Sequence, residues 1–135
     1  MDQRTLIVSC IEYYSYLKNI PANKVFSSFH RNAILPLILE SHEQFPEMGV
    51  GFYMGMIDGL IALESDAQAD DYLHFEERTA LGLEVVAMLA KRHRMNDREA
   101  CEMYYHSKTA ESVSEDKTGY YLKSAKEIFE LIEAE

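Results

Sequence analysis

The chain has 135 residues, of which 47% are hydrophobic and 27% charged, with 3 prolines and 6 glycines. That composition predicts one folded domain and excludes a disordered chain. The 23 acidic and 13 basic residues give a net charge of −10. Such a charge repels a phosphate backbone, so we expect no nucleic acid partner, and it favours a basic protein partner.

The compartment follows from the N-terminus and the cysteines. Residues 1–10, MDQRTLIVSC, lack the pattern of a signal peptide. The longest apolar run is shorter than the ~20 residues of a membrane span, so no membrane association is expected. Cys10 and Cys101 both fall in apolar helical patterns, as expected for buried thiols in a reducing compartment. We therefore predict a cytoplasmic protein.

Helical spacing of apolar residues predicts a helix over residues 3–18, followed by a second helix that begins near Pro21. Pro36 predicts a break or a new start within the apolar run 34–38. The core stripe expected for the first helix consists of Leu6, Ile7, Cys10, Ile11, Tyr14 and Leu17.

The next helix, predicted over residues 47–64, carries Gly51, Gly55 and Gly59 on one side because they recur every four residues. Each glycine costs about 1 kcal/mol of helix stability relative to alanine. A close helix–helix crossing would compensate for this cost. The crossing is either an internal contact, which the small size of the chain favours, or the seam of a homodimer.

Residues 66–77 are acidic and predict either a linker or a helix start. A long helix then runs to about residue 93, where Lys91, Arg92, His93 and Arg94 suit the negative end of the helix dipole. That explanation suffices for these cations, and a specific anion or RNA site is the minor alternative. Asn96 or Asp97 predicts the N-cap of the following helix.

The last helix has the apolar stripe Leu122, Ala125, Ile128, Phe129 and Ile132. No run of residues alternates as a strand does. The sequence therefore predicts an all-α, compact multi-helix bundle, with residues 1–135 as a single helical domain. A shift of 75 residues aligns the helical patterns, so residues 3–64 and 78–135 are possible pseudo-repeats, each a three-helix half.

Catalytic and metal motifs are missing from the sequence. "ESHEQF", residues 40–45, has no second histidine four residues after His42, as a helical zinc site requires. Cys101 and His106, five residues apart, do not share a helix face, which argues against a cysteine nucleophile. No phosphate-binding glycine loop or dinucleotide fingerprint is present. We therefore predict no catalytic residue, no metal site and no cofactor.

Residues 104–121, YYHSKTAESVSEDKTGYY, are rich in tyrosine and hydroxyl groups. They predict a structural edge of the bundle, a partner surface, or a small-ligand or catalytic site. We expect one ring of each tyrosine pair to face the core and the other to face a partner. The candidate partner-binding residues are Tyr104, Tyr105, His106, Tyr120 and Tyr121.

Residues 100–135, the C-terminal part of the chain, resemble small uncharacterised bacterial all-α domains of unknown function. The resemblance rests on Tyr105, Ser107 and Thr109, then on the turn of Asp116, Thr118 and Gly119, and on the final helix. Some of these domains are encoded beside ADP-ribosyltransferase-like or other toxin genes. The resemblance therefore implies an antitoxin or accessory role.

Two functions of different classes remain open. The first is a non-enzymatic interaction or regulatory module, antitoxin- or immunity-like, which binds a basic or toxin-like protein. The alternative is a small-ligand-binding or enzymatic bundle. Its polar pocket would lie between the halves and would include His30, Tyr104, Tyr105 and His106. A homodimer sealed by the glycine-bearing helix is a third possibility.

Overall fold

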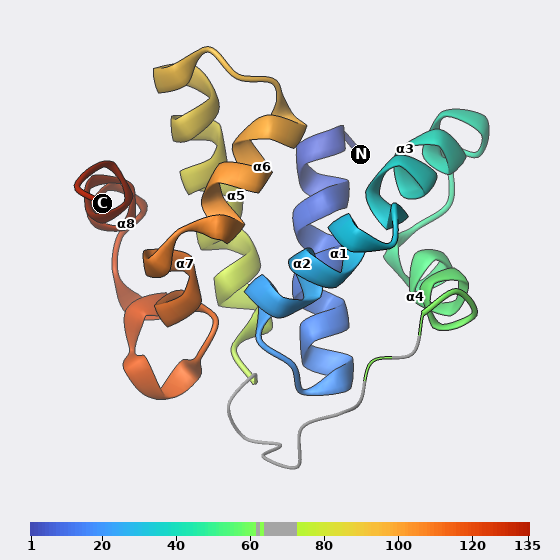
Figure 1. Cartoon of the computed structure of the whole chain (residues 1–135), viewed down its shortest axis with the longest axis horizontal. Coiled ribbons are helices and arrows are strands. Elements are labelled where there is room, and N and C mark those ends of the chain that lie inside the picture. The colour runs from blue at the N-terminus through green and yellow to red at the C-terminus, as the bar shows by residue number, and fades with distance from the viewer. Residues whose placement is uncertain (62, 64–72) are drawn as a thin grey trace.

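The computed structural model describes residues 1–61, 63 and 73–135, so most of the acidic stretch predicted at 66–77 lies outside the described residues. Within the described residues every regular element is helical, which confirms the predicted all-α bundle (Figure 1). The α-helices are α1 (Gln3–Lys18), α2 (Ala22–Arg31), α3 (Ile34–Gln44), α4 (Val50–Asp58), α5 (Phe75–His93), α6 (Asp97–His106), α7 (Lys108–Val113) and α8 (Ala125–Glu133). Two 3-10 turns, η1 (Asp116–Thr118) and η2 (Tyr120–Leu122), precede α8.

The two long helices α1 and α5 lie side by side at the centre, and α2 and α6 pack against α1 (Figure 1). On one side of this centre lie α3 and α4, and on the other lie α7 and α8. Gly82 permits the close approach of α1 and α5. A Cβ placed on it would lie 3.4 Å from Cγ1 of Val8 and 3.6 Å from the Tyr104 ring.

One apolar core joins the helices. The predicted stripe of α1 is confirmed from Leu6 to Tyr14, whereas Leu17 is 44% exposed. Burial of a large apolar side chain stabilises the fold by about 1.5–3 kcal/mol, so this stripe fixes how α1 packs. The fully buried apolar side chains include Leu6, Ile7, Ile11, Val25, Phe26, Phe29, Ile38, Tyr53, Ile57, Val85, Val86, Leu89 and Ile128.

The ends of the helices are capped by their own sequence. Asn96 is the N-cap of α6, as predicted, and forms a capping box with Glu99. Ser124 and Glu127 form a second capping box at α8. At its C-terminus, α1 ends on Asn19 in the left-handed conformation, and α5 ends on Arg94 in the same conformation.

Several boundaries differ from the prediction. Pro36 lies in the first turn of α3, where a missing amide donor costs nothing, so the apolar run starts one helix there. The helix predicted over 47–64 spans only Val50–Asp58. α7 occupies part of residues 104–121, for which no separate helix was predicted. α8 begins at Ala125, after a capping serine, which leaves Leu122 76% exposed.

The exposed glycines do not make the expected internal contact. Gly51 and Gly55 lie on the outer face of α4, and no described atom lies within 4 Å of a Cβ placed on either. Gly59 is the C-cap of α4, and the described atoms that a Cβ there would meet are backbone oxygens of its own helix. The close crossing occurs at Gly82 instead.

The helix boundaries repeat along the chain. A shift of 75 residues carries the bounds of α2 and α4 onto those of α6 and α8. It also carries Asn19 onto Arg94, the two left-handed C-caps with φ of 53°. The side chains at matched positions differ in chemistry, and duplication itself stays a prediction. The correspondence is incomplete, because the shifted bounds of α3 are 109–119 whereas α7 is Lys108–Val113.

Candidate functional site

The five residues predicted to bind a partner do not form one surface. Tyr104 and Tyr105 are only 1% and 3% exposed, so both rings of this pair lie in the core and the expected division was wrong. Tyr120 and Tyr121 are both half-buried, and His106 is exposed. Side chains of α1 and α2 pack against both aromatic rings of α6, and this packing explains why both rings are buried. Tyr105, for example, stacks on Phe26 with ring centroids 5.4 Å apart.

Two histidines of the proposed alternative pocket do come together. The rings of His30 and His106 meet edge to face, with centroids 6.4 Å apart. Nδ1 of His30 lies 3.8 Å from the Glu102 carboxylate. Tyr104 and Tyr105 point into the core below them, so the four residues do not line a common pocket.

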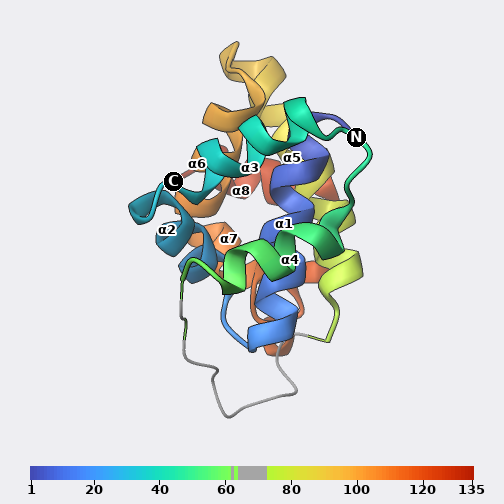
Figure 2. The same ribbon diagram turned by 90° about the vertical axis from the view of Figure 1, so that its right-hand side faces the viewer.

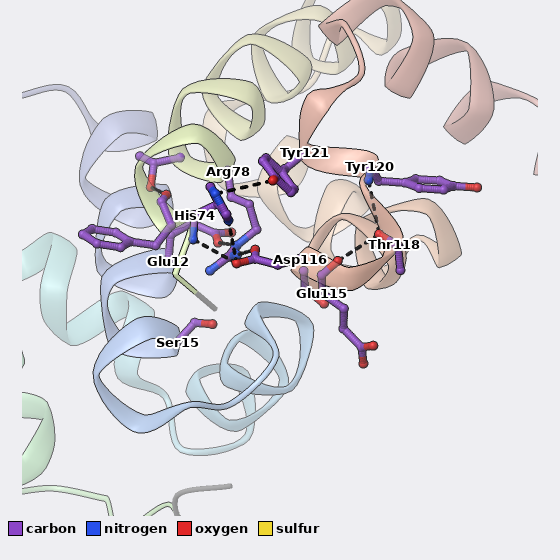
Figure 3. Close-up of polar contacts among 12 residues, drawn as sticks. Glu12, Ser15, His74, Arg78, Glu115, Asp116, Thr118, Tyr120 and Tyr121 are labelled. Atoms are coloured by element: carbon purple, nitrogen blue, oxygen red, sulfur yellow. Dashed lines mark hydrogen bonds and ion pairs between the residues drawn. The ribbon is translucent and has the colours of Figure 1, made fainter. Parts of the chain in front are cut away.

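A buried ionic network lies where α1, α5 and η1 meet, and Figure 3 shows its members. Arg78 of α5 has no exposed surface. Its Nε donates to Oε1 of Glu12 at 3.3 Å, and its Nη1 donates to Oδ1 of Asp116. Glu12, which is 2% exposed, also accepts a hydrogen bond of 2.8 Å from the Tyr105 hydroxyl. One cation thus holds two carboxylates from distant parts of the chain.

His74 extends this network to the surface (Figure 3). Oδ2 of Asp116 accepts from the His74 backbone N–H at 3.0 Å and lies 2.8 Å from Nδ1 of its ring. The Tyr121 ring stacks on the imidazole with centroids 4.3 Å apart. The Tyr121 hydroxyl lies 3.4 Å from Nε2. The turn η1 is thereby tied to the N-terminus of α5.

Burial governs the titration of the network. It raises the pKa of Glu12, because desolvation of the carboxylate outweighs the attraction of Arg78 and the hydrogen bonds that Glu12 accepts. Asp116 supplies the second carboxylate beside the same guanidinium, so the cation does not serve Glu12 alone. Burial and the neighbouring Glu12 carboxylate raise the pKa of Tyr105. Both groups therefore hold their protons more tightly than they would in water.

The network joins α1, α5 and η1 through buried ion pairs. A carboxylate-oriented histidine is a feature of general-base sites. Here the Tyr121 ring stacks on the imidazole of His74 and its hydroxyl lies 3.4 Å from Nε2, and the surface grooves described below are lined by other residues. Sequence reasoning did not single out Arg78 or Glu12. The signal was present, since Arg78 falls on the α5 stripe with Leu81, Val85 and Leu89, where a charged residue needs a buried partner.

Two grooves border the central helices. The first, about 370 Å³ in volume, lies between α1, α4 and α5. Its lining is Ser9, Tyr13, Val50, Phe75, Glu76 and Thr79. The rings of Tyr13, Tyr16 and Phe75 cluster at its rim, with Tyr16 and Phe75 stacked at 4.4 Å. This groove is apolar with a few hydroxyl groups, as small-molecule sites are.

The second groove, about 610 Å³, lies between α5 and α8 and has a different chemistry. Its lining is Met88, Lys91, Arg92, Arg94 and Phe129. Among the described residues, none of these three cations has an ion pair or side-chain hydrogen bond, whereas the neighbouring His93 pairs with Glu133 at 2.5 Å. We call it the cationic groove.

A third feature is the outer surface of α3 and α4, which faces the viewer in Figure 2. It carries three large exposed apolar side chains: Leu37, Phe45 and Phe52 are 39%, 47% and 45% exposed. Glu40 and Glu43 of α3 and Glu47 of the connection to α4 are also exposed, and their carboxylates form no ion pair with a described residue. These six residues, with Gly51 and Gly55, form what we call the α3–α4 face.

In the described part of the chain, no three histidine, cysteine, aspartate or glutamate side chains are placed to hold a metal ion together. None of the described helices has the length and apolar character needed to span a membrane. Comparison with protein families, with curated proteins and with solved structures finds no match for this chain.

Proposed function

We propose that the chain is a non-enzymatic interaction module that binds a basic, amphipathic protein segment on the α3–α4 face. The observation that carries this proposal is the combination of exposed apolar side chains with carboxylates that have no ion pair among the described residues. Interface cores are built around aromatic and aliphatic anchors, and charges at the rim select the partner.

The charge of the chain supports the same partner. The net charge of −10 attracts a basic protein over a long range and speeds its encounter. Phe45 and Phe52 would enter apolar pockets of the partner, while Glu40 and Glu43 would meet lysine or arginine at the rim. An antitoxin- or immunity-like role in the cytoplasm, implied by the resemblance of residues 100–135, would use this surface.

The proposal is tested by calorimetric titration with an amphipathic helical peptide that carries lysine on one face and leucine on the other. A peptide with glutamate in place of lysine serves as the opposite-charge control. We expect Phe45→Ser with Phe52→Ser, and separately Glu40→Lys with Glu43→Lys, to weaken binding of the basic peptide about tenfold or more. Leu122→Ser and Glu111→Lys alter exposed side chains elsewhere and should leave the affinity unchanged. Equal affinity for both peptides would refute the proposal.

A second copy of the chain is the competing occupant. Gly51 and Gly55 would then lie at the seam of a homodimer. Sedimentation equilibrium distinguishes the two cases, because a dimer that Gly55→Gln dissociates would assign the α3–α4 face to self-association and overturn the proposed partner. We expect a monomer.

The groove between α1, α4 and α5 favours a second candidate function, the binding of a small apolar molecule with one polar group. Its volume and its mixture of Tyr13, Val50 and Phe75 with the hydroxyls of Ser9 and Thr79 suit such a ligand. A screen of small aromatic alcohols by protein NMR would detect it. Shifts that spread over the surface, or that persist in Ser9→Phe, would remove this candidate.

A further inference from the structure

The cationic groove between α5 and α8 is a second concave surface, opposite in charge to the rest of the chain. Three of the 13 lysines and arginines line it, although the chain carries a net charge of −10. Met88 and Phe129, both half-buried, supply an apolar floor between the cations. Such a lining can contact carboxylates and an apolar side chain at the same time.

The helix dipole accounts for only part of this arrangement. Cations are favoured in the last turn of a helix, and His93, Lys91 and Arg92 satisfy that preference. Arg94 lies beyond the last turn, at the C-cap, in the left-handed conformation with φ of 53°. Glycine and asparagine are the residues that adopt this conformation readily, and arginine does so under strain.

The equivalent C-cap of α1 shows what the position prefers. Asn19 ends α1 with the same φ of 53°, and its backbone N–H bonds to Ser15 as that of Arg94 bonds to Ala90. Asn19, which adopts this conformation readily, therefore occupies the C-cap of α1, whereas a strained arginine occupies the C-cap of α5. Strained residues that persist in a fold are candidates for a functional role. The side chain of Arg94 lines the cationic groove.

We infer that the cationic groove binds an acidic segment of a partner protein, one in which carboxylates flank an apolar side chain. Arg92 and Arg94 contact the carboxylates, which the planar guanidinium matches in two-point hydrogen bonds. Met88 and Phe129 contact the apolar side chain. A nucleic acid is disfavoured, because its long row of phosphates would extend past the groove over an acidic surface.

Isothermal titration with short synthetic peptides tests this inference. The probes are Glu-Leu-Glu-Phe-Glu, a pentaglutamate and Lys-Leu-Lys-Phe-Lys, with a ten-nucleotide single-stranded DNA as the other anion. We expect the first peptide to bind most tightly, the pentaglutamate more weakly and the lysine peptide not at this groove. Binding should weaken as salt increases.

Arg94→Asn is the decisive variant because it separates binding from folding. It relieves the left-handed strain, so the melting temperature should stay the same or rise. The affinity for the acidic peptide should nevertheless fall about tenfold, as for loss of one hydrogen bond to a charged group. Arg92→Gln should weaken binding similarly. Lys24→Gln, which alters an exposed cation on α2, is the matched control and should change neither quantity.

Three results would overturn the inference. The first is no binding of the acidic peptide at millimolar concentration. The second is an affinity that is unchanged in both Arg92→Gln and Arg94→Asn. The third is tighter binding of the DNA that is lost in the same variants, which would assign the groove to nucleic acid. The groove shares no residue with the α3–α4 face, so either assignment can fail without the other.

Discussion

Arg78 and Asp116 lie 38 residues apart in the chain, and their side chains form an ion pair with 0% and 9% of their side-chain surfaces exposed. Glu12, which lies 66 residues before Arg78, occupies the other side of the same guanidinium. The pair joins α5 to η1, and Glu12 brings in α1. A charge in such a position is stable only while its partners are present.

Substitution of Arg78 should therefore destabilise the fold severely. We expect Arg78→Ala to destabilise the fold by about 3–5 kcal/mol, because two buried carboxylates lose their cation. Urea denaturation followed by circular dichroism measures the change. The triple variant Arg78→Met, Glu12→Gln and Asp116→Asn removes the charges of these three residues together and should recover much of the loss. A single variant as stable as the native chain would show that the pair has no such role.

The raised pKa of Glu12 predicts how stability depends on pH. Its folded-state pKa lies above the ordinary value of 4.5, so the folded protein binds this proton more tightly than the unfolded chain does. The contribution is fully present below pH 4.5 and is lost as the pH rises through the folded pKa. Glu12→Gln, which resembles the protonated acid, should become more stable relative to the native chain across that interval. Parallel unfolding curves from pH 4 to 8 would contradict this direction.

Adding a side chain distinguishes the exposed glycine from the packed one. Gly55→Ala should stabilise the chain by up to about 1 kcal/mol, because the helix gains propensity and the new Cβ meets no described atom within 4 Å. Gly82→Leu should destabilise it by at least about 1–3 kcal/mol, since its side chain must displace Val8 or Tyr104. Thermal melts of both variants give the comparison. Loss of stability in Gly55→Ala would indicate a contact with a partner or a second copy.

The two cysteines should be unreactive in the folded protein. Burial raises the pKa of Cys10 to about 12, and burial with the nearby Asp97 raises the pKa of Cys101 to about 12. The thiolate is the reactive form, so labelling by iodoacetamide at pH 8 should wait for unfolding. Mass spectrometry in increasing urea would follow it. Rapid modification of either thiol in the native protein would contradict the burial.

Local patterns in the sequence predicted much of the helical framework. The limits of α1 match the predicted 3–18, and the capping box of Asn96 and Glu99 confirms the start of α6. These features depend on residues a few positions apart. The sequence alone could not show which aromatic rings fill the core, because that depends on the distant α1 and α2 packed against Tyr104 and Tyr105. The sequence alone could not predict the α3–α4 face for the same reason, since the exposure of its residues depends on what packs beside them.

The buried network of Glu12, Arg78 and Asp116 contains residues from both halves of the chain. The shift of 75 residues that matches the helix bounds carries Glu12 onto Ala87 and Arg78 back onto Gln3. The second half contains both Arg78 and Asp116, whereas the first half supplies only Glu12. A separate second half would keep the Arg78–Asp116 pair and lose Glu12, so the network is complete only when the two halves are together. The same asymmetry would make them a natural pair for fragment complementation.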